Sequence, residues 1–370
     1  MRIRVPVAIA VGATLLLAAC GDDDSKSDST SAPTTAAASG DTTAPAGGDC
    51  VVGVSWNNYQ EERWAKWDEP ALKAAIEAGG GTYVSNDAKS SAETQASNLE
   101  NLITQGAKVL VVLAQDGEAI KPAVASAIAG GVPVIAYDRL IEDPNALYMT
   151  FDNVEVGRMI ARSVFEKVPT GKYVIIKGAS TDANADFLRG GFEEVIGDAV
   201  KSGDIEIVGE TYTDNWDPAN AQTEMEQFLT ATDNKVDAVL SENDGMAGGV
   251  IAALEAQGLA GKTVVSGQDG EQAALNRVAV GTQTVSVWKD ARQLGTAAGE
   301  AALALCKDPS AAAVPGTATF TTPGGNDVAS VLLKPIPVSQ DNLDLVLDAG
   351  WIDKATLCDG ADAAVVKVCA

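Results

Sequence analysis

The sequence predicts an α/β protein with two lobes, each built on a parallel β-sheet that is covered by helices on both faces. The first observation is that short β-branched runs alternate with amphipathic segments of helical period from Cys50 onward. Such alternation is typical of parallel sheets in doubly wound folds. The second is length, because residues 50–370 are too many for one compact core and enough for two lobes.

The strands and helices are predicted in chain order. In the first series, strands are expected at residues 51–56, 109–113 and 132–136, with helices at 61–78, 91–105 and 118–129. Glycines follow these helices, at the position where a helix end favours them. A second series of strands is expected at 173–176, 205–208, 238–240 and 263–265. We therefore assign residues 50–152 with 290–330 to an N-terminal lobe, and residues 153–289 with 331–370 to a C-terminal lobe.

The first residues predict export and a lipid anchor. Arg2 and Arg4 precede an apolar run at 5–16, which is shorter than the roughly 20 residues that span a bilayer. Small residues lead directly to Cys20, as in a bacterial lipoprotein signal, whose cleavage leaves a lipid-modified cysteine at the new N-terminus. An ordinary secretory signal with a chance cysteine is the alternative. Residues 21–49 are small and polar, so we expect a disordered tether.

Charge and histidine content restrict the partners. The formal net charge is −25, and removal of Arg2 and Arg4 with the signal gives 24 − 51 = −27. A chain this acidic repels nucleic acid and anionic lipid, so we expect no nucleic-acid partner and membrane contact through the lipid alone. The sequence contains no histidine, the commonest transition-metal ligand, and its cysteine spacings fit no zinc site. We predict no metal and no cofactor.

Four cysteines remain after the lipidation site. They are even in number in an exported protein, which indicates two disulfides with three possible pairings. We favour Cys358 with Cys369, which are close in sequence, and Cys50 with Cys306.

Polar and aromatic side chains follow the predicted strands, where open parallel sheets bind their ligands. One such residue usually caps the next helix. The whole set combines carboxylates, amides, arginine and tryptophan, which suits vicinal hydroxyls and the apolar face of an uncharged polyol ring. The set comprises Asn57, Asn58, Asp116, residues 137–139, residues 180–184, residues 214–216, Asn243, Asp244, Gln268, Asp269, Trp288 and Lys289.

One segment imitates a phosphate-binding loop. Residues 256–263 fit a relaxed form of that pattern. A true phosphate loop follows a strand and opens a helix, whereas here glycines end a helix and a strand follows. We therefore predict no nucleotide site.

The chain resembles the periplasmic D-xylose-binding protein family, a branch of the ribose- and galactose-type binding proteins of ABC importers. The resemblance runs from about residue 51 to 350 in matching order and spacing. The segments that carry it are Glu62-Arg63-Trp64, residues 134–139, Phe151-Asp152-Asn153, residues 215–218, Asn243-Asp244, residues 247–249, residues 266–269 and residues 281–284.

The resemblance implies a type I periplasmic-binding-protein fold, with three hinge crossings near Asn153, Lys289 and Leu333, and a monomer that closes on a monosaccharide. D-xylose is favoured over glucose, arabinose, ribose or a xylose oligomer, and the closed form delivers it to an ABC importer permease. The implied ligand residues donate to or accept from the sugar, or sandwich its ring between two tryptophans. They are Arg63, Trp64, Asp138, Arg139, Asn184, Trp216, Asn243, Asp269 and Lys289.

Some positions depart from the family. Asp186 stands where a lysine is familiar and Leu188 where a phenylalanine is, beside Asn184 at the expected sugar edge. Asp138 is expected to support Arg139 or to accept from a hydroxyl. Three alternative functions are a glycosidase that uses Asp138 and Asp269, a ligand-responsive repressor, and a sensor component that presents sugar to a receptor. The crowding of these acids by arginine and asparagine argues against the first, and the signal with its tether, in place of a helix-turn-helix, argues against the second.

Overall fold

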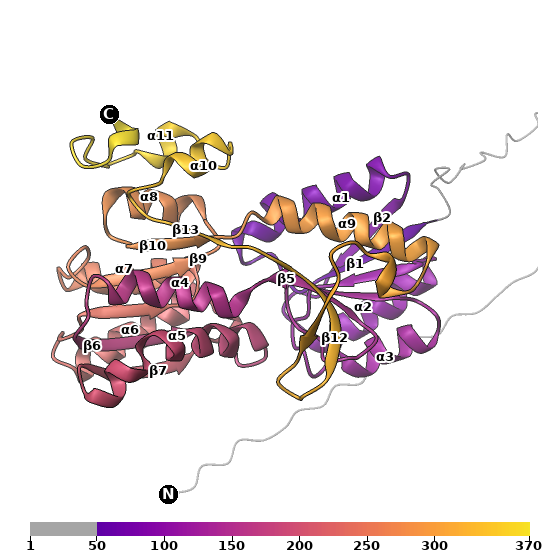
Figure 1. Cartoon of the computed structure of the whole chain (residues 1–370), viewed down its shortest axis with the longest axis horizontal. Coiled ribbons are helices and arrows are strands. Elements are labelled where there is room, and N and C mark those ends of the chain that lie inside the picture. Colours follow the sequence, from indigo (N-terminus) through magenta and orange to yellow (C-terminus); the bar gives the residue numbers. More distant parts are fainter. Residues whose placement is uncertain (1–49) are drawn as a thin grey trace, which may run out of the picture. The chain divides into compact units, whose positions relative to one another are not determined.

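The computed structural model describes residues 50–370 (Figure 1). The predicted signal, the lipidation site Cys20 and the tether at 21–49 lie outside the described residues. Within residues 50–370, no helix has the length and apolar character needed to cross a membrane.

The first lobe is built on a seven-stranded sheet in the order β11-β12-β5-β4-β3-β1-β2. Its pairs are parallel except for the antiparallel pair β11–β12. The strands are β1 (Val51–Trp56), β2 (Thr82–Asp87), β3 (Val109–Val112), β4 (Val134–Tyr137), β5 (Leu147–Phe151), β11 (Ala318–Thr321) and β12 (Asp327–Leu333). Its helices are η1 (Trp64–Asp68), α1 (Glu69–Ala78), α2 (Ala92–Thr104), α3 (Lys121–Ala129), α9 (Ala291–Lys307) and η3 (Ala311–Ala313).

Both faces of this sheet are buried, which explains why an inner strand such as β3 is continuously apolar. On β3, Val109 and Val111 belong to the cluster that contains α1 and α9 side chains. Leu110 and Val112 face the cluster formed with α2 and α3. Helices α1 and α9 approach closely because α9 has a glycine at position 299, where a Cβ would lie 2.7 Å from the Cβ of Ala75.

The second lobe is built on a six-stranded sheet in the order β13-β10-β9-β8-β6-β7, with only β13 antiparallel. The strands are β6 (Gly171–Lys177), β7 (Ile205–Tyr212), β8 (Ala238–Ser241), β9 (Val264–Gln268), β10 (Val285–Trp288) and β13 (Ile336–Val338). Its helices are α4 (Asn153–Phe165), α5 (Ala183–Ser202), η2 (Asp214–Trp216), α6 (Pro218–Ala231), α7 (Asp244–Ala256), α8 (Gln272–Val280), α10 (Asp344–Asp348), α11 (Lys354–Leu357) and η4 (Lys367–Cys369).

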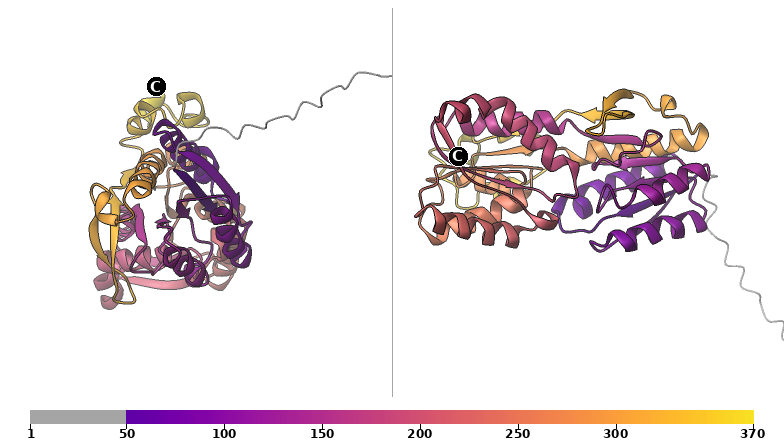
Figure 2. Two further views of the ribbon diagram at one scale, coloured as in Figure 1. Left: turned by 90° about the vertical axis from the view of Figure 1, so that its right-hand side faces the viewer. Right: turned by 90° about the horizontal axis from the view of Figure 1, so that it is seen from below.

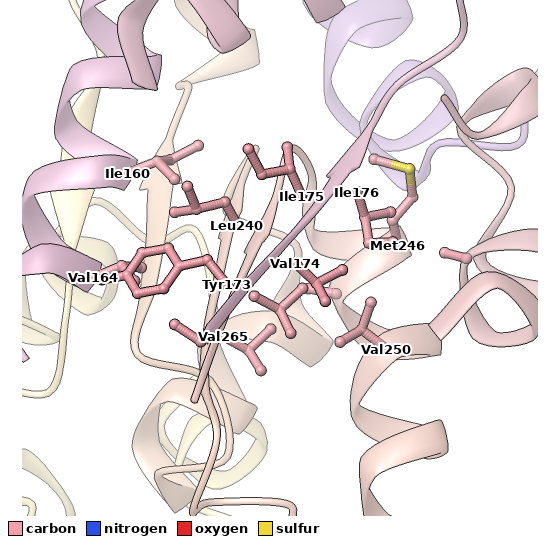
Figure 3. Packing of buried hydrophobic residues seen from close by; sticks show 14 of the residues in the cluster. Ile160, Val164, Tyr173, Val174, Ile175, Ile176, Leu240, Met246, Val250 and Val265 are labelled. Atoms are coloured by element: carbon pink, nitrogen blue, oxygen red, sulfur yellow. The ribbon is translucent and has the colours of Figure 1, made fainter. Parts of the chain in front are cut away.

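Alternate residues of β6 face opposite helix layers of this lobe. Figure 3 shows Tyr173 with Ile160 and Val164 of α4 on one side of the strand, and Val174 toward Val250 of α7 on the other. The chain passes between the two sheets three times, after β5, β10 and β12 (Figure 1). These features confirm the predicted fold class of two parallel-sheet lobes joined by a three-crossing hinge.

The structure corrects several predicted details. The proposed boundary between residues 330 and 331 falls inside β12, which pairs with β5 as far as Leu333. The helix expected at 61–78 begins with a π-helical turn, η1, before α1. Strands β2, β5 and β10 to β13 were not predicted. The segment at 256–263 joins the end of α7 to β9, as its reversed context indicated.

Both favoured disulfides are present. Cys50, just before β1, bonds with Cys306 of α9, and Cys358 bonds with Cys369 in the last residues of the chain. The first bridge ties the N-terminal strand to a helix that returns from the far end of the sequence. The second closes a short loop in the C-terminal segment, which we define as residues 339–370 (Figure 1).

Candidate ligand-binding site

A small cavity lies between the lobes, at the carboxyl ends of the parallel strands. All nine residues named from the sequence line it, and the structure therefore brings them together. Glu61, Asp182 and Gln268 also line it. The N-terminal lobe supplies the residues after β1 and β4, whereas the other lobe supplies those that follow β6, β7, β8, β9 and β10.

Arg63 is the centre of one buried charge network. Its Nε and Nη2 donate to the two carboxylate oxygens of Asp68 at 2.9 and 2.8 Å. Its Nη1 lies 3.1 Å from Asp138 Oδ2 and 3.4 Å from Asp269 Oδ1. Lys289 adds a second cation, with Nζ 3.6 Å from the same Asp269 oxygen. The Asp138 carboxylate thus pairs with Arg63 and not with Arg139, so the first of its two expected roles, support of Arg139, is not seen.

The acids of this network differ in proton affinity. Burial raises the pKa of Asp68 to about 6, in spite of the Arg63 charge and the Tyr137 hydroxyl that donates to it. Burial also acts to raise the pKa of Asp138, but the charges of Arg63, Lys289 and Arg139 outweigh it and hold that pKa below its ordinary value. Asp138 is therefore ionised at neutral pH and is unsuited to act as a general acid.

Arg139 is the centre of a second network. Its Nη2 donates to Glu61 Oε1 at 3.0 Å, and its Nε lies 3.0 Å from Asp182 Oδ2. The other Glu61 oxygen accepts from the Trp64 indole N–H at 2.6 Å. Burial raises the pKa of both Glu61 and Asp182 despite the neighbouring guanidinium. Glu61 thus fixes one arginine and one tryptophan of the cavity wall together.

Two indoles form apolar walls of the cavity, one from each lobe. The Arg63 guanidinium lies over the Trp64 ring, 4.4 Å from its centroid. Trp216 rests on Gly178, where a Cβ would lie 2.0 Å from the ring, so only glycine fits there. Each indole is backed on one side by protein, and both residues line the cavity.

Three of the cavity residues have left-handed backbone: φ is 60° at Asp138, 57° at Trp216 and 98° at Asp269. Such conformations cost on the order of 1–3 kcal/mol and persist where the surroundings fix them. For Asp269 the fixing partner is the buried Asp244 carboxylate, which accepts from the backbone N–H groups of Gly270 and Glu271 at 3.0 Å each. The backbone is thus held in the geometry that directs these side chains to the cavity.

The lobes also contact each other directly around the cavity. Asn184 Nδ2 donates to the Asp138 carbonyl at 3.1 Å, and Gln115 Nε2 donates to Asn215 Oδ1 at 2.9 Å. Together with the Arg139–Asp182 pair, these contacts define a closed arrangement of the two lobes.

Asp186, Leu188 and Trp288, which the sequence analysis singled out, do not line the cavity. Asp186 is exposed and accepts from the Tyr212 hydroxyl, and Leu188 is buried in the core of its lobe. Neither lines the cavity, which corrects their expected place at the sugar edge. Trp288 is buried against the C-terminal segment. The sequence offered no signal for Glu61 or Asp68, because their role depends on arginines that only the fold places beside them.

Comparison with known proteins identifies the class that this fold and site define. The family model for the periplasmic binding protein domain matches residues 52–310. The chain belongs to this family of two-lobed binding proteins. Within residues 50–370, no group of side chains has the composition of a metal site.

The particular relatives are sugar-binding proteins. The chain is 39% identical over 308 residues to the D-xylose-binding periplasmic protein of Escherichia coli K12, which covers 83% of this chain and 92% of that protein. It is 33% identical to the multiple sugar-binding periplasmic receptor ChvE of Rhizobium radiobacter, covering 82% and 91%. It is also similar to the crystal structure of an ABC transporter solute binding protein from Clostridium phytofermentans with bound β-D-glucose, with TM-score 0.76, 29% identity, and coverage of 83% and 99%.

Proposed function

We propose that this protein captures an uncharged monosaccharide, D-xylose above others, in the cavity between its lobes. The observation that carries this proposal is the pairing of charges in the cavity wall. Each arginine faces acidic partners, with Asp68, Asp138 and Asp269 around Arg63, and Glu61 and Asp182 around Arg139. Because Arg63, Arg139 and Lys289 all have acidic partners, the wall offers no unpaired cation to an anionic ligand and favours one that carries hydroxyls and no net charge.

The side chains divide into donors, acceptors and apolar walls. Arg63, Arg139 and Lys289 donate to sugar hydroxyls or the ring oxygen, and the carboxylates of Asp138 and Asp269 accept. Hydrogen bonds to charged groups contribute about 1.5–3 kcal/mol each, so a few of them can offset the cost of association.

The remaining cavity residues set the plane of the sugar ring. Trp64 and Trp216, one from each lobe, cover the two apolar faces of the ring. Asn184 and Asn243 complete the polar contacts from the C-terminal lobe. The side chain of Asn243 is held in place because its Oδ1 caps α7 by accepting from the Met246 N–H at 2.8 Å.

The choice of xylose rests on the relatives. Beside the Escherichia coli protein, the D-xylose-binding periplasmic protein of Haemophilus influenzae is 36% identical over 311 residues. Glucose is the main competitor, because it is the bound sugar in the Clostridium phytofermentans structure.

Binding proceeds by closure of the lobes about their three connections. Sugar bound to one lobe adds polar partners for the other and shifts the population from open to closed. No bond is made or broken, and no catalytic step is assigned. The related binding proteins support this account over that of a glycosidase, and so does the low pKa of Asp138.

Isothermal titration calorimetry against D-xylose, D-glucose, L-arabinose and D-ribose tests the proposal. We expect one site with a Kd of about 1 μM or tighter for xylose, which corresponds to about −8.2 kcal/mol. Absence of heat with every aldose at millimolar concentration would refute it.

We further propose that the mature chain is a monomer that is held at the membrane by a lipid on Cys20 and delivers its sugar to an ABC importer. The sequence of residues 1–20 supports the anchor. In cells, Cys20→Ala should move the protein from the membrane fraction to the soluble fraction. Size-exclusion chromatography with light scattering tests the monomer.

A sensor that presents sugar to a membrane receptor is the second candidate, favoured by the similarity to the ChvE receptor. Deletion of the importer permease distinguishes the two. Loss of xylose uptake together with an intact transcriptional response to xylose would favour sensing as an additional role.

A further inference from the structure

The C-terminal segment places a tryptophan behind the sugar cavity. Trp351, which follows α10, is 1% exposed and belongs to a cluster with side chains of α8 and α11. This cluster lies outside the cavity, and Trp351 is not among the residues that line it. In Figure 1 the segment, in yellow, lies beside α8. The left view of Figure 2 shows it next to an indigo helix of the N-terminal lobe.

Trp351 contacts three separate parts of the chain. Its ring stacks on Trp67 of η1, with centroids 4.4 Å apart and planes inclined by 21°. Its Nε1 donates to the carbonyl of Gly270 at 2.5 Å. Its ring also meets the edge of Trp288, with centroids 5.5 Å apart.

Each of these parts carries a residue of the cavity wall. Trp67 lies on the same helical turn as Trp64, and Gly270 directly follows Asp269. Trp288 directly precedes Lys289. One buried side chain therefore supports the wall at three places, which are η1 of one lobe, and the Gly270 loop and the end of β10 of the other.

The Asp269 loop depends most on outside support. Asp269 and Gly270 both have left-handed backbone, with φ of 98° and 74°. The N–H of Gly270 is held by Asp244, and its carbonyl by Trp351. Glycine adopts such a backbone freely, whereas Asp269 keeps it only where the surroundings fix the loop. Trp351 contributes to this by supplying the partner for the Gly270 carbonyl.

Trp351 itself is held rigidly. Arg292, at the start of α9, donates from Nη1 to the Ala349 carbonyl at 2.9 Å, and its guanidinium lies 5.0 Å from the Trp351 ring centroid. Gln272 Nε2 donates to the Trp351 carbonyl at 2.8 Å. The disulfide between Cys358 and Cys369 closes the chain beyond it.

We propose that Trp351 is a positioning residue for the sugar site, which holds the Asp269 loop in its binding geometry and links it to η1 across the lobes. This inference rests on the sugar-binding function proposed above. Leu357 provides a matched control, because it is fully buried in the same cluster but is absent from the contacts with Trp67, Gly270 and Trp288.

The experiment compares Trp351→Ala, Trp351→Phe and Leu357→Ala with the wild type, each as the whole chain. Hydrogen exchange of the peptide 267–272 is measured without sugar, and the xylose Kd is measured by calorimetry. We expect Trp351→Ala to speed exchange of that peptide about tenfold and to weaken xylose binding by about the same factor. Trp351→Phe keeps a ring but lacks the N–H, so it should loosen the peptide less.

Leu357→Ala should lower the thermal midpoint and leave both the peptide 267–272 and the Kd within about twofold of the wild type. Unchanged exchange in Trp351→Ala, or an equal rise in Leu357→Ala, would overturn the proposal. A wild type that binds no aldose, with a loosened peptide in Trp351→Ala, would refute the sugar function and leave the mechanical link standing.

Discussion

Replacement of Trp216 by alanine should weaken sugar binding about thirtyfold. A tryptophan side chain buries about 150–250 Å², and this indole packs against the backbone of Gly178. In the proposed sandwich the sugar covers about half of that area, on the order of 80–100 Å². At roughly 25 cal/mol per Å² its loss costs about 2 kcal/mol, or about thirtyfold in Kd.

Calorimetry with xylose measures this change, and the thermal midpoint of the free protein shows whether the lobe still folds. Phe228→Ala is a suitable control, because Phe228 also packs on a glycine of the same lobe, Gly209, but lies outside the cavity lining. It should lower stability without changing the Kd. A loss of less than about threefold in Trp216→Ala would show that the indole is not a wall of the sugar site.

Three further predictions concern the charges and the disulfide. Arg139→Lys keeps the charge, but a lysine ammonium cannot reach both Glu61 and Asp182 as the guanidinium does, so the xylose Kd should rise about tenfold to a hundredfold. An unchanged Kd would contradict the role assigned to the guanidinium of Arg139. Burial raises the pKa of Glu242, which directly follows β8, well above its ordinary value. The contribution of this carboxyl to the free energy of unfolding is therefore present at low pH and is lost as the pH rises through the raised pKa. Glu242→Gln should therefore raise the thermal midpoint relative to the wild type at pH 8 but not at pH 5, and an equal difference at both would refute this reasoning. Replacing Cys50 and Cys306 by serine removes a disulfide between residues 256 apart in the sequence, and the free energy of unfolding measured with urea should fall by about 3–5 kcal/mol. A fall of less than about 1 kcal/mol would show that this disulfide contributes little to stability.

The fold class could be predicted from the sequence because strands of a sheet that is buried on both faces consist of consecutive apolar residues. Strand β3 and the middle of β6, residues 173–176, are continuous apolar runs, and glycines mark the helix ends. Strands β2 and β11 were missed because they are only partly buried or exposed, and their residues lack that apolar signal. The return of residues 290–330 to the first lobe was predicted, but the boundary cut β12 because its pairing with β5 as far as Leu333 is not encoded in a local pattern.

The site was predictable where it follows strand ends, and less so elsewhere. Asp138, Trp216 and Asp269 come directly after strands or close to their ends, where ligand residues are expected. The partners that hold the arginines could not be found in this way, since Asp68 lies inside a helical turn and serves Arg63 only through local geometry. The expected place of Asp186 and Leu188 at the sugar edge was wrong because proximity to Asn184 in the sequence does not place side chains of α5 on the same face.

The contribution of Trp351 was equally hidden from sequence patterns. It lies 81 residues from Gly270, to which it donates, and much further from Trp67, on which it stacks. Such contacts arise from the way the C-terminal segment folds back along α8.

The most direct test of the central claim is a crystal structure of the protein grown with D-xylose. We predict one sugar in the cavity between the lobes, with its ring between Trp64 and Trp216 and its hydroxyls on Arg63, Arg139 and Asp269. A sugar bound elsewhere, or a cavity that stays without sugar at millimolar xylose, would contradict the account.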